Sequence, residues 1–398
     1  MIKIDYSTYV DSFIKKDNFN KLYAQKEEIY QKFDNDFMTG WTKKIDDSVI
    51  DKIIRVSNRI KENSDCLVVI GIGGSFLGSY AVEQMLKPYF DKNNTFEIIY
   101  AGTTLSSKYM KELLDYLENK DFTINVISKS GTTMETTITY NLIKDLMKKK
   151  YSKDEIVKRI IVTTDKEKGS LRDEVNEMGY ESFEIADNIG GRYSFITPAH
   201  LLPLALNFDI NKIVEGYYKG EELREEAFKY AIIRNLLFKE GRYVENFCVY
   251  EQSIYYFTEW LKQLFGETEG KEGVGILPMS TVHTRDLHSL GQFIQEGNNI
   301  IFETFIKVLE SDYLEYNKMD LHSINNVVLD SVVRAHNSGE VPCNIIEISS
   351  LCEENIAMLM YFFMLSAAFS GYLFGIDPFN QPGVEVYKKE VREGLKNA

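Results

Sequence analysis

The stretch CLVVIGIGGSFLGSYAVEQMLKPYF, residues 66–90, joins an unbroken apolar run to a glycine-rich turn and then to a helix pattern. So continuous an apolar run is typical of a strand buried on both faces of a parallel sheet. The alternation continues to residue 187, with strands FEIIYAG, INVISKSG, RIIVTT and ESFEIAD and with helices over KYMKELLDYLENK and 133–149. It predicts a parallel sheet with crossover helices on its faces.

The same alternation restarts in the second half of the chain. Its expected strands are RYVENFCVY, VGILPMST, NIIFETFIKVL and NIIEISS, and its expected helices are QSIYYFTEWLKQLFG, 285–295, 320–337 and 353–374. The stretch GGRYSFITPAHLLPLALNFDI and a charged helix near EELREEAFKY join the two halves. We therefore expect an α/β protein with an N-terminal helical segment (1–45), a first α/β domain (46–205) and a second (206–398) that ends in a helix.

Composition and charge narrow the class of protein. A formal charge of −14 argues against general nucleic-acid binding, which needs a concentrated basic surface. The N-terminus lacks the apolar core of a signal peptide, and we expect the apolar stretch 358–376 to be a buried core helix rather than a membrane span. The cysteines show no CxxC pair and no zinc spacing, so they are interpreted as buried thiols of a cytoplasmic protein; they are Cys66, Cys248, Cys343 and Cys352.

Four glycines punctuate the turn VVIGIGGSFLGSYA, residues 68–81. A dinucleotide fingerprint fails here, because Phe76 takes its last glycine position and the strand FEIIYAG ends without the acidic residue that would hold a ribose. No Walker lysine follows either. What remains is a turn in which Ser75 and backbone N–H groups can approach a small ligand, or a turn that is merely tight.

Six hydroxyl side chains crowd the stretch VISKSGTTMETT, residues 126–137. A plain loop is the ordinary explanation, since Ser, Thr and Gly are turn residues. The alternative is a phosphate cradle, because hydroxyls and the free N–H groups of a helix start suit a phosphate monoester. Two such turns on one sheet edge favour phosphate binding; the donors are Ser128, Ser130, Thr132 and Thr133.

Four other stretches offer charged side chains, each with a structural alternative. Arg192 follows two glycines in DNIGGRYSFITP, although a lone loop arginine is usually solvated. In FGETEGKEGVGILP, Glu267 follows an aromatic-rich helix and suits proton transfer, whereas Glu269 and Glu272 are interpreted as a solvated acidic loop. Near the start of HTRDLHSLGQFIQEG, His288 lies beside an apolar face, where structural histidines outnumber catalytic ones.

The last stretch, NQPGVEVYKKEVREGL (380–395), is expected to be a helix with Pro382 in its first turn. Its predicted buried stripe is Val384, Tyr387, Val391 and Leu395. Spacing places Lys388 on the flank of that stripe, whereas Lys389 is expected to pair with Glu385 and face solvent.

Together these stretches resemble the glucose-6-phosphate isomerase family in its shorter bacterial-type form. The resemblance runs from about residue 35 to 392, through GIGGSFLG, SKSGTTMET, GGRYSFITP, GETEGK, DLHSLGQFIQEG and FNQPGVEVYKKE in the family's order. It implies two sugar-isomerase-type (SIS) αβα domains, a homodimer, and interconversion of glucose 6-phosphate and fructose 6-phosphate without metal or cofactor. Most of the usual C-terminal extension is missing, and the region near 215–245 is shortened.

The resemblance also assigns roles. It implies that Glu267 shuttles the proton between C1 and C2, that His288 opens the ring from the neighbouring subunit, that Lys388 lies at the ring oxygen, and that Arg192 lies beside the enediolate. The implied substrate-binding residues are Gly74, Ser75, Ser128, Lys129, Ser130, Thr132, Thr133 and Gln381. Use of mannose 6-phosphate stays open. A sugar-phosphate-binding regulator without catalysis is the alternative, although the acidic N-terminal segment offers no basic DNA-binding helix pair.

Overall fold

The structure is a computed structural model that describes residues 2–5, 13–90, 92 and 95–396. The chain forms two compact units. The first unit comprises residues 37–215, and the second unit comprises residues 1–36 together with 216–398. The expected N-terminal segment 1–45 is therefore divided between the two units, and parts of it, residues 1 and 6–12, lie outside the described residues.

The first unit contains the expected parallel sheet. Its strands are β2 (Cys66–Ile70), β3 (Glu97–Ala101), β4 (Phe122–Ile127), β5 (Ile160–Thr164) and β6 (Glu181–Glu184). They lie in the order β3-β2-β4-β5-β6, and every neighbouring pair is parallel. The chain runs from β2 to β3 on one side and then to β4 on the other, so the direction of winding reverses next to β2.

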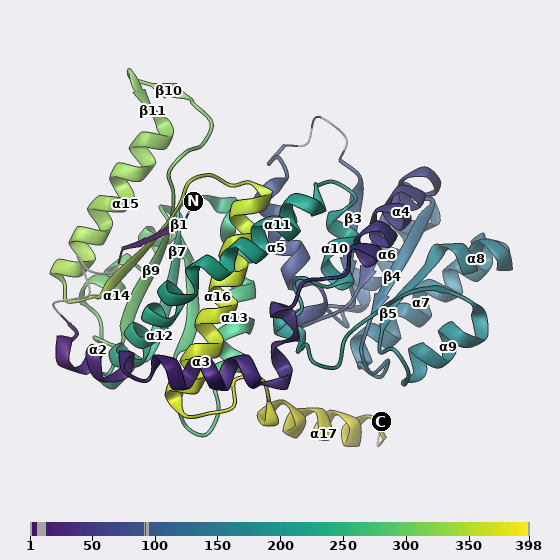
Figure 1. The fold of residues 1–398 in the computed structure, drawn as a ribbon. Helices are drawn as coiled ribbons and strands as arrows, with labels where there is room; N and C mark the ends of the chain where they lie inside the picture. Colours follow the sequence, from purple (N-terminus) through teal and green to yellow (C-terminus); the bar gives the residue numbers. More distant parts are fainter. Residues whose placement is uncertain (1, 6–12, 91, 93–94, 397–398) are drawn as a thin grey trace. The chain divides into compact units, whose positions relative to one another are not determined.

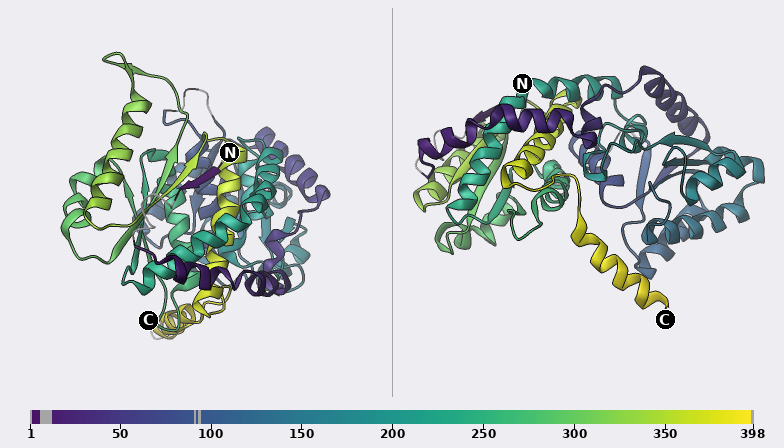
Figure 2. Two further views of the ribbon diagram at one scale, coloured as in Figure 1. Left: turned by 60° about the vertical axis from the view of Figure 1, so that its left-hand side comes forward. Right: turned by 60° about the horizontal axis from the view of Figure 1, so that its bottom comes forward.

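Helices cover both faces of this sheet (Figures 1 and 2). The helices of the unit are α4 (Asp47–Asn63), α5 (Leu77–Leu86), α6 (Ser107–Glu118), α7 (Met134–Lys150), α8 (Lys153–Arg159), α9 (Ser170–Met178), α10 (Pro198–Leu204) and the first part of α11 (Ile210–Lys219). One apolar core joins the sheet to α6, α7 and α9, while α4, α5 and α10 pack together elsewhere. Strand β2 is fully buried, as its unbroken apolar sequence predicts.

The second unit contains a sheet of the same parallel winding. Its strands are β1 (Ile2–Asp5), β7 (Val244–Val249), β8 (Leu277–Val282), β9 (Ile301–Val308) and β12 (Cys343–Ile348), in the order β1-β12-β9-β7-β8. Only β1 is antiparallel to its neighbour, β12. This edge strand was not expected, because four residues of IKID carry too short a pattern to predict. A two-stranded hairpin, β10 (Glu315–Tyr316) and β11 (Met319–Asp320), precedes α15.

Except for α17, the helices of the second unit lie on the two faces of its sheet (Figure 1). They are α2 (Lys16–Tyr23), α3 (Lys26–Asn35), α12 (Arg224–Lys239), α13 (Tyr255–Glu269), α14 (Gly291–Glu296), α15 (Leu321–Ser338), α16 (Glu353–Phe374) and α17 (Pro382–Lys396). Helix α15 packs on β7, β9 and β12 in one core cluster, and α12 packs against α16 and Phe302 of β9 in the other.

Helix α16 is long and apolar enough to cross a membrane, but 83% of that stretch is buried inside the chain. Burial of this degree matches the core helix expected near residues 358–376.

Candidate active site

The glycine turn after β2 lies directly against the loop that carries Arg192. The turn forms a short 3-10 helix, η2 (Gly73–Ser75), and the loop forms another, η3 (Gly191–Tyr193). A Cβ atom at Gly74 would lie 2.2 Å from the carbonyl oxygen of Gly191 and 2.9 Å from the backbone nitrogen of Arg192. Only glycine fits there. The structure thus brings the GIGGS and GGRYS motifs together, and Arg192 is buried.

A buried histidine that the sequence did not single out, His200, contacts both loops: its Nε2 lies 2.7 Å from the carbonyl oxygen of Gly74 and 3.2 Å from Ser194 Oγ. The backbone N–H of Ser79 donates to Nδ1 of His200 at 3.0 Å, so Nδ1 carries no proton. Nε2 therefore carries the proton and donates it to the carbonyl oxygen of Gly74 at 2.7 Å. Burial lowers the pKa of His200 to about 4, which keeps the ring neutral near neutral pH. His200 is a positioning residue.

The SKSGTT turn follows β4 and supplies its hydroxyls at the start of α7. The backbone N–H of Gly131 donates to Ser128 Oγ at 3.1 Å, and Gly131 itself adopts a φ of +70°. Ser130 and Thr132 share a hydroxyl–hydroxyl hydrogen bond of 2.9 Å and are both exposed. A Cβ at Gly131 would lie 2.5 Å from Ser170 Oγ, so position 131 requires glycine both for its φ and for space.

The first turn of α7 has no side-chain cap. Thr133 occupies the N-cap position, yet its side chain accepts no hydrogen bond from the helix backbone. N–H groups at a helix start and side-chain hydroxyls are both hydrogen-bond donors, which suit an anion.

Lys129 ties the same turn to the loop that leads to Arg192. Its ammonium group lies 3.1 Å from a carboxylate oxygen of Asp187 and 3.3 Å from the carbonyl oxygen of Ala186. These contacts bring SKSGTT and DNIGG to the same edge of the sheet.

The turns after β2 and β4 lie where the sheet reverses its direction of winding. Strands β2 and β4 are hydrogen-bonded parallel neighbours, with Ile70 opposite Val126, so their following turns emerge side by side. In open parallel sheets, ligands bind in the crevice beyond the carboxyl ends of the strands at this switch point. Ser75, half-buried in η2, belongs to this edge together with the SKSGTT hydroxyls.

In the second unit, Glu267 lies near the end of α13. It is half-buried, and Gln263, one turn earlier, donates to its Oε1 at 3.1 Å. Glu272 is exposed, as expected, but the same interpretation was wrong for Glu269, which is fully buried. The guanidinium of Arg234 donates to both carboxylate oxygens of Glu269.

Arg234 makes a second buried ion pair through Nε, which lies 2.7 Å from Glu245 Oε2. Its guanidinium also lies 3.9 Å from the centre of the Phe265 ring. Because Glu269 and Phe265 flank Glu267 on α13, this network fixes the part of the helix that presents the Glu267 carboxylate. The sequence reading missed Arg234, since its partners lie 11 and 35 residues away in the chain.

Lys271 joins the end of α13 to the segment that leads into α17. Its ammonium donates to the carbonyl oxygens of Asp377 and Asn380 at 2.7 and 2.6 Å. Gln381 is the next residue after Asn380 and is exposed. The structure therefore brings the GETEGK and FNQPG motifs together within the second unit.

Helix α17 differs from its prediction in two respects. The predicted buried stripe was wrong: Tyr387 and Leu395 are 59% and 60% exposed, Val391 is exposed and Val384 is half-buried. Figure 2 shows α17 extending away from the sheet of its own unit. Periodicity predicts that a helix has one apolar face, but not that another element covers it.

The predicted pairing of Lys389 with Glu385 was also wrong, although Lys389 faces solvent as expected. Lys388 pairs with Glu385 at 3.0 Å, and Lys389 lies 3.9 Å from Glu393. Spacings of three and of four residues both place side chains within reach on a helix, so spacing alone does not choose between the two lysines. Lys388 remains half-exposed.

His288 lies beyond the opposite end of β8 from Glu267. The expected helix over 285–295 is broken into a 3-10 turn, η6 (Arg285–His288), and the short helix α14. His288 is exposed, and so are Leu290 and Phe293 beside it, whereas Ile294 is buried. Thus the predicted apolar face is only partly buried.

Two sets of groups with different chemistry result. The first unit gathers hydroxyl and N–H donors with the buried Arg192, which suits an anionic ligand. The second unit offers a half-buried carboxylate, a lysine and an exposed histidine, which are acid–base groups.

Comparison with known proteins identifies the family. The family model described as phosphoglucose isomerase matches residues 55–332. Glucose-6-phosphate isomerase of Staphylococcus epidermidis is 46% identical over 385 residues, covering 90% of this chain and 86% of the relative, and that of Staphylococcus aureus is 45% identical over 383 residues with the same coverage.

Solved structures share the fold. A glucose-6-phosphate isomerase from Chlamydia trachomatis superimposes with a TM-score of 0.84 at 20% identity, covering 99% of this chain and 88% of its own. A hypothetical protein from Thermus thermophilus does so with a TM-score of 0.87 at 24% identity, covering 99% and 100%. At these identities the likeness concerns the fold, and it agrees with the expected sugar-isomerase architecture. The family match and the close relatives together establish that the chain belongs to the phosphoglucose isomerase family.

Proposed function

We propose that this chain interconverts glucose 6-phosphate and fructose 6-phosphate, with the phosphate bound by the first unit. Membership of the phosphoglucose isomerase family supports this aldose–ketose isomerisation. The SKSGTT turn supports the phosphate site, because its exposed hydroxyls adjoin the uncapped start of α7. The proposed contacts are Gly74, Ser75, Ser128, Lys129, Ser130, Thr132 and Thr133, with Gln381 from the second unit.

The proposed chemistry uses four side chains. Glu267 takes a proton from one of C1 and C2 and returns it to the other through a cis-enediol, which needs one carboxylate on one face of the intermediate. Arg192 stabilises the negative charge of the enediolate, an effect that is strong in a site shielded from water. His288 and Lys388 act at the ring oxygen and its hydroxyl during ring opening.

The placement of His288 supports a homodimer. Strand β8 begins ten residues after Glu267 and ends six residues before His288, so these two residues lie toward opposite ends of the strand. A six-residue strand spans about 20 Å. One chain can hardly bring both groups to the same sugar, whereas a second copy can supply His288 from its exposed surface.

Subunit complementation tests this proposal. His288→Ala and Lys388→Ala should each be nearly inactive as homodimers. After exchange, each mixed dimer has one site that lacks both groups and one that lacks neither. Random exchange of equal amounts makes about half the dimers mixed, so roughly a quarter of wild-type activity should return. Exchange verified by mass with no recovery would contradict a shared site.

The reaction itself is tested by a coupled assay with fructose 6-phosphate, without added metal, before and after EDTA. Turnover in both conditions is expected. A non-catalytic regulator built on the same fold would bind the sugar phosphate without turnover; the family match does not favour it. We also propose a cytoplasmic location, supported by four free cysteines, since disulfides are rare in that compartment.

A further inference from the structure

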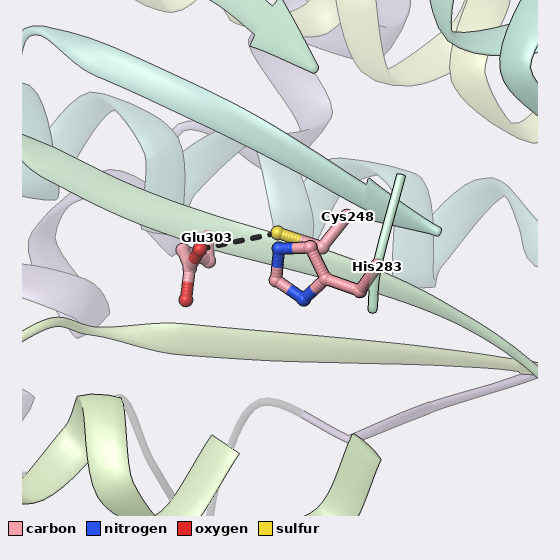
Figure 3. Close-up of side chains that lie close together, drawn as sticks. All are labelled: Cys248, His283 and Glu303. Atoms are coloured by element: carbon pink, nitrogen blue, oxygen red, sulfur yellow. Dashed lines mark hydrogen bonds between the residues drawn. The ribbon is translucent and has the colours of Figure 1, made fainter. Parts of the chain in front are cut away.

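Three potential metal ligands meet inside the second unit, and none of them is assigned a role in isomerisation. Cys248 lies on β7, His283 directly follows β8, and Glu303 lies on β9 (Figure 3). Their exposed fractions are 0%, 4% and 0%. One ligand atom from each lies within 4.8 Å of the others. No sequence motif predicts this cluster, because its members are 35 and 20 residues apart and match no zinc spacing.

One atom in this cluster has no hydrogen-bond partner among the described residues. Nδ1 of His283 lies 3.4 Å from the hydroxyl of Tyr250, whereas the buried Nε2 is unpartnered. In Figure 3 the ring of His283 turns a nitrogen toward the sulfur of Cys248, on the side where Glu303 lies. A buried polar atom without a partner is costly, so its orientation indicates a missing ligand.

We propose that Cys248, His283 and Glu303 bind one Zn²⁺ ion, which joins the three neighbouring strands β8, β7 and β9. Zinc bonds of about 2.0–2.3 Å in tetrahedral geometry place ligand atoms roughly 3.3–3.6 Å apart. Sγ of Cys248 already lies 3.2 Å from Oε1 of Glu303. A thiol and an imidazole favour Zn²⁺ over Mg²⁺ or Ca²⁺, which take oxygen ligands.

The surrounding contacts complete the site. His336 Nδ1 lies 2.6 Å from Glu303 Oε2, and Asn246 Nδ2 donates to Oε1 at 2.9 Å, so the carboxylate is held in orientation. On binding, the S–H bond of Cys248 breaks and its proton passes to solvent. The thiolate and the carboxylate then balance the two charges of zinc.

Metal binding can be measured without reference to isomerisation. The full chain is stripped of metal, and Zn²⁺ or Co²⁺ is added either to the native chain or during refolding from urea, since the site is buried. We expect one ion per chain by elemental analysis and a thiolate-to-cobalt charge-transfer band with Co²⁺. The thermal midpoint should rise with zinc concentration, because zinc binds the folded chain in preference to the unfolded one.

Substitutions distinguish zinc binding at Cys248 from zinc binding at another cysteine. Cys248→Ser should abolish the charge-transfer band and the zinc-dependent rise in thermal midpoint, and Glu303→Gln should lower zinc affinity at least tenfold. The control Cys352→Ser changes the half-buried cysteine before α16 and should retain both signals. Circular dichroism of each metal-free variant checks its fold. Absence of bound metal in both additions, or a band that survives in Cys248→Ser, would overturn the proposal.

Discussion

The two parallel sheets share one strand order but place their functional groups differently. The two orders compared are β3-β2-β4-β5 and β8-β7-β9-β12. In each set, the strand that comes first along the chain, β2 or β7, lies between the two strands that follow it in sequence. The first unit gathers its polar turns beyond the carboxyl ends of β2 and β4. The second unit places Glu267 and Lys271 before β8, at the amino ends of its strands, and His288 after it. Strand order defines the switch point of a sheet, but the ends of the crossover helices decide which groups an edge presents.

The interiors of the two units also differ. The second unit buries Arg234 completely between the carboxylates of Glu245 and Glu269. A comparable cross-element ion pair of the first unit, Lys52 with Glu181 at 3.0 Å, is partly exposed. The Arg234 pair is thus shielded from solvent and the Lys52 pair is not, so removing the cation should have a different cost in the two units.

The largest expected effect concerns this contrast. Arg234→Met leaves two buried carboxylates without their cation and should reduce the free energy of unfolding by about 3–5 kcal/mol. The matched variant Lys52→Met should cost at most about 1 kcal/mol, because solvent screens that pair. Urea denaturation of both variants measures the difference. Equal losses would mean that burial does not separate the two pairs.

Each unit also buries one neutral histidine, His200 and His283, with the pKa lowered to about 4 by burial. The unfolded histidine has a pKa of about 6.5, so between these values the unfolded chain binds more protons and acid favours it. Stability from His200 should be complete above pH 6.5 and fall by about 3 kcal/mol as the pH approaches 4. Urea denaturation at pH 7.5 and 4.5 measures how much the free energy of unfolding falls with acid. In His200→Gln this fall should be smaller than in the wild type, and the part that remains includes the contribution of His283. An equal fall in the free energy of unfolding in His200→Gln and the wild type would contradict the burial of a neutral His200.

The acid–base role of the second unit is tested by Glu267→Gln. Loss of a general base typically costs at least about 10²-fold in kcat, while KM should stay within several-fold. The control Glu272→Gln changes an exposed carboxylate on the following loop and should behave as wild type. A Glu267→Gln variant that keeps a tenth of wild-type kcat would remove Glu267 from the mechanism.

The binding role of the first unit is tested by Ser130→Ala and Thr133→Ala. Each removes a hydrogen bond to a charged group, worth about 1.5–3 kcal/mol, so KM should rise roughly tenfold to a hundredfold. Ser152→Ala removes a hydroxyl that caps α8 and should leave KM unchanged. Unchanged KM in both turn variants would show that SKSGTT does not hold the phosphate.

Much of the local structure followed from the sequence. The unbroken apolar run at 66–70 predicted β2, and alternation of strand and helix patterns predicted both parallel sheets. Gly74 and Gly131 marked turns that structure shows to need glycine. These features can be predicted from the sequence because burial on both faces and tight turns constrain residues that are adjacent in the chain.

Contacts between distant segments were decided by the tertiary structure. Glu267 and Glu269 share one short acidic stretch, yet only Glu269 meets Arg234 and becomes fully buried. Cys248, His283 and Glu303 meet because β8, β7 and β9 are neighbours. The spacing of residues along the chain predicts which face of a helix or strand a side chain occupies. The side chain that it contacts depends on which strands pair and where each helix ends. That is why the sequence by itself predicted the two parallel sheets, and only the folded chain placed the buried charges and brought Cys248, His283 and Glu303 together.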